Sequence, residues 1–214
     1  SPLNDRLAYI SRAEVAAYLD EIDTNALGTK LIGFTGGEPF MNPEFIAMLE
    51  DTLSRGHQAL VLTNAMKPMQ QKSAALADLQ KTHGDRLVLR VSIDHYTSSV
   101  HEAERGTGTW GPMIKGLAWL RDHGFSLNIA GRNLTGEPEA TLREGFARMF
   151  QDLDLPLDSA NPVDLVVFPE MDASADVPEI TDACWGLLSV SPDDQMCASA
   201  RMVVKRKGAA APAV

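Results

Sequence analysis

The sequence predicts an α/β protein built from repeated strand–helix units around a parallel sheet. Short apolar runs, such as Leu31-Ile32-Gly33-Phe34, alternate along the chain with longer segments whose apolar residues recur at helical spacing. Repeated units of this kind form parallel sheets with right-handed crossovers. The chain is therefore expected to fold either as a doubly wound sheet or as a (β/α) barrel.

The first two helices are predicted from their start signals. Ser11 and Glu14 have the spacing of a capping box, and the apolar residues that follow predict a helix over residues 11–24. Asn42 and Pro43 are typical of an N-cap followed by proline at the first helical position. A second helix is therefore expected from there to residue 56, with a short strand over residues 30–35 between the two helices.

The alternation continues through the rest of the chain. Further strands are expected at residues 59–64, 86–94, 126–133 and 164–170. Further helices are expected at residues 68–83, 110–124, 137–153 and 178–188. Residues 1–172 are expected to form the barrel part, and residues 173–214 a C-terminal appendage that begins where Asp, Ser and Pro become frequent.

Polar and small residues stand at the end of every predicted strand. In a barrel these ends converge on one mouth, whereas a doubly wound sheet concentrates its site at one switch point. The distribution favours a partial (β/α) barrel of about five parallel strands. The strand-end residues are Gly36, Gly37, Glu38, Thr63, Asn64, Ser92, Asp94, Arg132, Asn133 and Glu170.

Composition excludes several classes of protein. The 214-residue chain has 29 acidic and 19 basic residues, so its net charge of -10 repels nucleic-acid phosphates and anionic lipid headgroups. No apolar run approaches the ~20 residues that cross a bilayer. We expect a cytoplasmic protein with neither nucleic acid nor membrane as its partner.

The stretch Phe34 to Phe45, FTGGEPFMNPEF, places two glycines and a glutamate directly after a strand. Glycines let a ligand approach the backbone, and the carboxylate can accept hydrogen bonds from an amine. Together with Asn64 closing the next predicted strand and Ser92 to Asp94 closing the one after, this pattern resembles the radical S-adenosylmethionine (radical SAM) superfamily of iron-sulfur oxidoreductases. A plain strand–helix turn is the alternative for the glycines.

The resemblance implies roles for the strand-end residues. Gly36, Gly37 and Glu38, followed by Pro39, would contact the methionine group of SAM. Residues Asn64, Ser92 and Asp94 would lie around SAM or the substrate. Arg132 and Asn133 would lie where family members bind the carboxylate or ribose of SAM. The alternatives are strand-end capping for Asn64 and Ser92, and a surface ion pair for Arg132.

Residues 101–124 also resemble the family, because an Arg-Gly-x-Gly segment there precedes a helix. Alternatively, Gly106 and Gly108 only shape a loop. A metal site made of Asp94, His95, His101 and Glu102 fits no common ligand spacing, and a solvated loop is expected in its place.

The family's chemistry depends on three cysteines spaced C-x3-C-x2-C that bind a 4Fe-4S cluster, from which an electron passes to SAM and a deoxyadenosyl radical forms. This chain has Cys184 and Cys197 alone, and they do not supply that triad. Two hypotheses remain for these thiols: they supply half of the ligands of an auxiliary cluster, or they are small buried residues.

We therefore expect a fragment of a radical SAM enzyme that lacks the first barrel strand together with its cysteine loop and is inactive by itself. A fragment with a free sheet edge is expected to self-associate. The parent enzyme would use SAM, a 4Fe-4S cluster and a reductant such as flavodoxin or ferredoxin, and would act on a small molecule or peptide. The alternative is a non-catalytic barrel that binds a small amine-bearing ligand.

Overall fold

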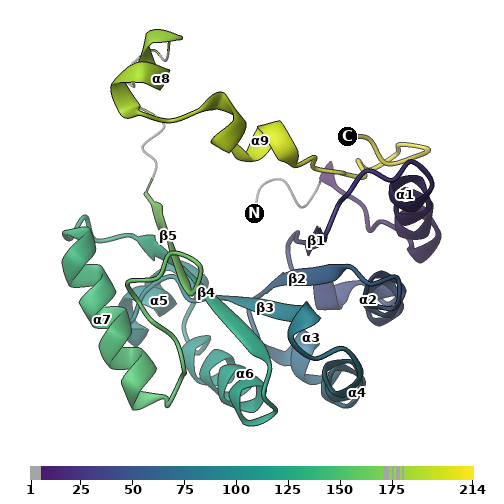
Figure 1. The fold of residues 1–214 in the computed structure, drawn as a ribbon. Coiled ribbons are helices and arrows are strands. Elements are labelled where there is room, and N and C mark those ends of the chain that lie inside the picture. Colours follow the sequence, from purple (N-terminus) through teal and green to yellow (C-terminus); the bar gives the residue numbers. More distant parts are fainter. Residues whose placement is uncertain (1–5, 171–173, 175, 177–178, 180) are drawn as a thin grey trace. The chain divides into compact units, whose positions relative to one another are not determined.

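The computed structural model describes residues 6–170, 174, 176, 179 and 181–214. Five parallel strands form one sheet in the order β1-β2-β3-β4-β5. This half-barrel confirms the predicted fold class (Figure 1). The strands are β1 Leu31–Phe34, β2 Gln58–Thr63, β3 Leu87–Ser92, β4 Ser126–Asn133 and β5 Leu165–Pro169.

Side chains on the strands alternate between a face covered by helices and an inner face. In β3, Leu87, Leu89 and Val91 are fully buried, while Arg90 and Ser92 lie on the opposite side and are half-buried. Successive helices follow the outer face of the curved sheet (Figure 1). The inner face of the half-barrel thus carries polar residues near the strand ends.

Helices connect the strands in the expected order. Helices α2, α4, α6 and α7 lie around the outside of the sheet (Figure 1). The helices of this part are α1 Arg12–Thr24, α2 Phe45–Ser54, α3 Lys67–Gln70, α4 Ser73–His83, α5 Ser98–Arg105, α6 Trp110–Asp122 and α7 Glu139–Asp152. Short 3₁₀ helices occur at η2 Pro39–Met41 and η3 Gly84–Arg86.

Of the two predicted helix starts, the first is confirmed and the second is wrong. The capping box of Ser11 and Glu14 is present in full. The prediction that Asn42 caps the next helix is wrong, because its side-chain oxygen accepts a hydrogen bond from the Glu44 amide at 3.0 Å within a turn, and α2 begins at Phe45. The preceding residues form η2 instead, with Glu38 as its cap.

Two other expectations about helices need correction. The helix expected over residues 68–83 is divided into α3 and α4. The loop expected before α6 contains α5, whose His101 is buried rather than solvated. Gly106, with a φ of 100°, ends α5 in a conformation that side chains rarely adopt.

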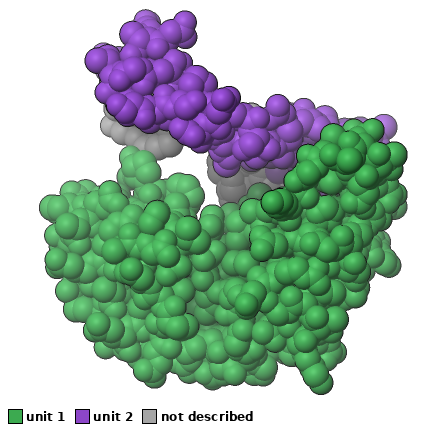
Figure 2. Space-filling view, in the orientation of Figure 1, with its two compact units in different colours: residues 1, 11–170 green, residues 2–10, 171–214 purple. Residues whose placement is uncertain are grey.

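The chain divides into two compact units (Figure 2). The first contains residues 11–170, and the second contains residues 2–10 and 171–214. The second unit contains α8 Ala183–Leu188, η4 Pro192–Asp194 and α9 Met196–Ser199. Antiparallel bridges join Leu7 to Arg206 and Val204 to Ala213. The predicted boundary at residues 172 and 173, and part of the helix expected over residues 178–188, lie outside the described residues.

Within the described residues, β1 pairs with β2 alone, so one of its edges carries no neighbouring strand. Leu31 on this strand is 49% exposed. Self-association through this edge stays a prediction. Among the described residues, no helix combines the length and the apolar character that a membrane crossing requires.

Gly116 is the position at which α6 approaches the backbone after β2. A Cβ placed on Gly116 would lie 1.8 Å from the Ala65 carbonyl oxygen, a backbone atom that cannot move away freely. We expect Gly116→Ala to lower the free energy of unfolding by about 1–3 kcal/mol, as overpacking does. Thermal unfolding would measure this as a drop of roughly 2–4 °C per kcal/mol.

The matched control is Gly111→Ala in the same helix. A Cβ on Gly111 meets nothing within 4 Å. Alanine is preferred to glycine in helices, so this variant should keep or slightly raise the melting temperature. Equal effects at the two positions would contradict the close approach at Gly116.

Candidate functional site

Glu38 joins the end of β1 to the end of β2. Its carboxylate accepts hydrogen bonds from the Asn64 amide at 2.9 Å and from the Thr63 hydroxyl at 3.0 Å. It also accepts one from the Phe40 amide at 3.3 Å, which caps η2. A single carboxylate therefore sets the positions of two neighbouring strand ends.

The environment of Glu38 disfavours its charge. Burial raises the pKa of Glu38 and outweighs the hydrogen bonds from Asn64, Thr63 and Phe40 and the more distant charge of Arg105, which lower it. No cation forms an ion pair with Glu38 among the described residues. A ligand ammonium group would supply the missing countercharge.

Gly36 and Gly37 are exposed at the end of β1, next to Glu38. Gly36 has a φ of 144°, which side chains rarely adopt, and a Cβ placed there would meet nothing within 4 Å. The space above this backbone is thus open to a ligand. Pro39 is buried and begins η2, so its role is to direct the chain away from the strand.

A pocket of about 240 Å³ lies beside these strand ends. It is smaller than the ~300–1,000 Å³ of pockets that enclose a whole drug-sized ligand, so it would hold only part of a nucleoside-containing molecule. The strand ends and the segment from α5 to α6 supply its walls. Its lining residues are Asn64, Met66, Ser92, His101, Arg105, Thr109 and Met113.

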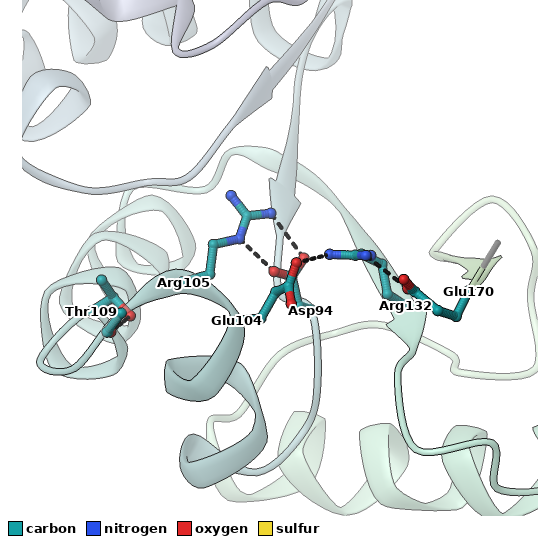
Figure 3. A network of polar contacts seen from close by, with 7 residues as sticks. Asp94, Glu104, Arg105, Thr109, Arg132 and Glu170 are labelled. Atoms are coloured by element: carbon teal, nitrogen blue, oxygen red, sulfur yellow. Dashed lines mark hydrogen bonds and ion pairs between the residues drawn. The ribbon is translucent and has the colours of Figure 1, made fainter. Parts of the chain in front are cut away.

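Asp94 and Arg105 form an ion pair next to this pocket. The Arg105 Nε and Nη2 atoms donate to the two carboxylate oxygens of Asp94 at 2.5 and 2.8 Å. The Asp94 side chain is 2% exposed and that of Arg105 is 37% exposed. Figure 3 shows the third nitrogen of Arg105 pointing away from Asp94. Asp94 therefore fixes a guanidinium whose remaining donors can reach a ligand.

His101 and Glu102 complete this side of the pocket. His101 is buried, with its Nδ1 atom lacking a hydrogen-bond partner among the described residues, and burial lowers its pKa. Glu102 accepts hydrogen bonds from the Gly108 and Trp110 amides at 3.0 and 3.1 Å. Glu102 thereby holds the loop that carries Thr109, another lining residue.

Arg132 and Asn133 lie at the end of β4, outside the pocket lining. Arg132 donates to Glu104 at 2.6 Å and to Glu170 at 2.7 Å, so it bridges α5 to the end of β5 (Figure 3). Asn133 donates to the Glu137 carbonyl at 2.8 Å, while its side-chain oxygen is buried without a partner among the described residues. The arrangement of Arg132 corresponds to the ion pair weighed as its alternative role.

His95 and Glu137 connect the loops that follow β3 and β4. The Thr97 amide donates to His95 Nδ1 at 3.0 Å, which assigns the proton to Nε2, 3.0 Å from the Glu137 carboxylate. Burial raises the pKa of Glu137, but hydrogen bonds from His95, Thr135 and Tyr96 bring it below its ordinary value. This cluster fixes the two loops to each other.

The structure brings together part of the predicted set. Glu38, Asn64, Ser92 and Asp94 lie at neighbouring strand ends around the pocket. Sequence reasoning did not predict Thr109 as a lining residue; it named His101 only for a metal site that it set aside, and Arg105 only as part of the Arg-Gly-x-Gly segment. A usable signal was present, because His101 and Arg105 are four residues apart and share one face of a helix.

Comparison with known proteins decides the family. The family model of the Radical SAM superfamily matches residues 3–144. The chain belongs to the radical SAM superfamily. This superfamily binds SAM, and the match confirms the resemblance drawn from FTGGEPFMNPEF and the strand ends that follow.

Relatives of this radical SAM chain are longer. AlbA of Bacillus subtilis (strain 168), an antilisterial bacteriocin subtilosin biosynthesis protein, is 31% identical over 97 residues, which are 45% of this chain and 21% of AlbA. The crystal structure of Streptococcus suis SuiB shares the fold with a TM-score of 0.58 at 14% identity. That match covers 84% of this chain and 39% of SuiB.

SuiB has also been solved with ligands. Its structure bound to S-adenosylmethionine has a TM-score of 0.58, 13% identity, and covers 78% of this chain and 35% of SuiB. Its structure bound to the precursor peptide SuiA has a TM-score of 0.57. At this level of identity the likeness establishes the fold of our chain and no more.

The two cofactors of the superfamily fit this chain differently. The open backbone at Gly36, the uncompensated Glu38 carboxyl and the free donors of Arg105 suit the amino acid group of SAM. A cluster held by three cysteines does not fit, because the chain has two, Cys184 and Cys197. No group of three potential metal ligands occurs among the described residues.

The predicted auxiliary cluster also stays a prediction. Cys184 is a free, half-buried thiol that accepts a hydrogen bond from the Thr181 amide at 3.4 Å. The side chain of Cys197 lies outside the described residues. The described geometry favours neither the cluster nor the structural thiol.

The Asp94–Arg105 pair should contribute more to stability than the exposed pairs around it. Asp94→Asn removes one partner of a largely buried ion pair, and we expect a loss of about 3 kcal/mol in the free energy of unfolding. Urea unfolding would measure the loss. Glu104→Gln is the control, since it breaks the exposed pair with Arg132 and should cost less than about 1 kcal/mol. A larger loss for Glu104→Gln than for Asp94→Asn would contradict this prediction.

Proposed function

We propose that this chain is the SAM-binding part of a radical SAM enzyme that modifies a peptide. The observation that carries the proposal is the junction made by Glu38, where an uncompensated carboxyl group and an open glycine backbone adjoin a pocket that contains Arg105. An amino acid group carries one ammonium and one carboxylate. Glu38 offers an acceptor for the ammonium group, and Arg105 offers donors for the carboxylate. Asn64, whose amide donates to Glu38, lines the same pocket as Arg105.

In this arrangement each residue has a distinct role. Glu38 and the backbone of Gly36 and Gly37 bind the ammonium group of SAM. Arg105, held by Asp94, binds the carboxylate through its remaining donors. Ser92, on the pocket wall, adds a hydroxyl group for the rest of the ligand.

The peptide substrate is supported by the relatives alone. AlbA is a bacteriocin biosynthesis protein, and SuiB has been solved with a precursor peptide. Because this chain spans 21% and 39% of these proteins, the substrate, the reductant such as flavodoxin or ferredoxin, and the cytoplasmic location belong to the proposal for the whole protein. The 4Fe-4S cluster would supply the electron that cleaves SAM.

The second candidate function is a non-catalytic barrel that binds a small amine. The absence of a three-cysteine set from this chain favours it. Anaerobic reconstitution of the full-length protein with iron and sulfide separates the two candidates. Release of deoxyadenosine from SAM supports the enzyme, whereas a colourless protein that leaves SAM intact supports the binding barrel.

Glu38→Gln should weaken SAM binding to this chain roughly tenfold or more, because hydrogen bonds to charged groups contribute about 1.5–3 kcal/mol. Isothermal titration calorimetry at pH 7.5 measures the effect. Since the pKa of Glu38 is raised, binding to the wild type should begin to weaken at a higher pH than it would for a carboxyl of ordinary pKa 4.5. Protonation removes the charge that the ammonium group requires.

The control for this experiment is Glu21→Gln, which removes an exposed carboxylate on α1. This variant should bind SAM as the wild type does, with the same pH profile. Unchanged affinity in Glu38→Gln would contradict the role of Glu38. The raised pKa also means that folding favours the protonated form, so the contribution of Glu38 to stability falls as the pH rises through its pKa.

Arg105→Lys should reduce the preference of the chain for SAM over decarboxylated SAM. Lysine keeps a positive charge near Asp94 but lacks the planar fork that contacts two groups at once. Calorimetry with both ligands gives the preference as a ratio of dissociation constants. We expect that ratio to fall at least tenfold; an equal loss of affinity for both ligands would show that Arg105 acts elsewhere.

A further inference from the structure

Arg90 lies on the inner face of the half-barrel, in the second half of β3. Its neighbours in register are Leu62 on β2 and Asn128 on β4, and both are uncharged. Ser92, two residues further along the same face, lines the pocket beside the SAM site. Because a strand rises about 3.3 Å per residue, Arg90 lies about 7 Å from Ser92 along β3, deeper in the half-barrel.

The guanidinium of Arg90 has no counterion among the described residues. Its Nε atom is buried without a hydrogen-bond partner, and burial alone lowers its pKa. Six other arginines of the described chain have carboxylate partners, namely Arg12, Arg55, Arg105, Arg121, Arg132 and Arg143. Arg86 forms no such pair, but it donates to the Leu53 carbonyl at 2.6 Å instead.

This isolation is informative because acidic residues are abundant. The chain has 29 of them and a net charge of -10, yet none forms an ion pair with Arg90 among the described residues. A guanidinium remains charged at all accessible pH values, and leaving its buried Nε donor unsatisfied costs stability. Such a group is best explained by a ligand that satisfies it.

We propose that Arg90 binds a carboxylate group of the substrate. This rests on the proposed function, in which the substrate enters the half-barrel next to SAM. A guanidinium fork matches the two oxygens of a carboxylate, and the uncharged neighbours Leu62 and Asn128 leave one positive charge at this position. One charge suits a carboxylate, such as that of an acidic residue in a peptide, better than a phosphate dianion.

The test is an NMR titration of the full chain with two matched probes. N-acetyl-glutamate N-methylamide carries the carboxylate, and N-acetyl-glutamine N-methylamide is its neutral counterpart. We expect the Arg90 Nε–H signal and the backbone amide of Asn128 to shift with the acidic probe alone. Equal shifts with both probes, or no shift with either, would overturn the proposal.

Variants give the second measurement. In Arg90→Gln the dissociation constant of the acidic probe, followed at the Asn128 amide, should rise at least tenfold. Arg143→Gln, which alters an arginine paired with Glu139 on α7, should leave it unchanged. Tighter binding of inorganic phosphate than of the acidic probe to the wild type would overturn the assignment to a carboxylate.

The melting temperature and the SAM affinity of Arg90→Gln test whether Arg90 has a structural role or a role in SAM binding instead. Arg90→Gln removes an unpaired charge, so its melting temperature should stay the same or rise; a drop of several degrees would reveal a structural partner and overturn the proposal. Its dissociation constant for SAM should match that of the wild type. Failure of the wild type to bind SAM would count against the proposed function, whereas the response to the two glutamate probes decides the role of Arg90 separately.

Discussion

The carboxylate of Glu38 is the interaction on which the geometry of the site depends. It receives hydrogen bonds from Thr63 and Asn64 at the end of β2 while it caps η2 after β1. This single group therefore links the segment after β1 to the end of β2. Because the donors are a hydroxyl and main-chain amides rather than a cation, the carboxyl remains electrostatically uncompensated. The same interaction that orders the strand ends thus leaves a charge for a ligand to neutralise.

Arg105 differs from Glu38 because its charge has a counterion. Its charge is compensated by Asp94, which is almost completely buried at the end of β3, and the pairing fixes the direction of the guanidinium. Glu102, on the same helix, fixes the loop that precedes α6. Both sets of contacts position the pocket wall without a ligand. An acceptor without a counterion and a donor with a fixed orientation are the two groups to which our proposal assigns the ammonium and the carboxylate of SAM.

Sequence patterns predicted the five strands and the half-barrel because buried strands are continuous apolar runs and their ends are polar. They failed for α5, whose segment from Ser98 to Arg105 is almost entirely polar and resembles a solvated loop. Only the spacing of His101 and Arg105 indicates a common face. Asn42 misled for a related reason, since its side chain stabilises a turn as readily as a helix start. The partner of Asp94 depends on tertiary packing and could not be deduced from local sequence.

Three arginines of the half-barrel differ in how far their charges are neutralised. Arg132 bridges two carboxylates at the rim, Arg105 shares one at the pocket, and Arg90 has none on the inner face of β3. The unneutralised positive charge therefore increases from the rim toward the interior. In a chain of net charge -10, such a gradient cannot arise from a shortage of acidic residues. It favours an anionic group deep in the half-barrel, while the overall negative surface repels anions that do not fit there.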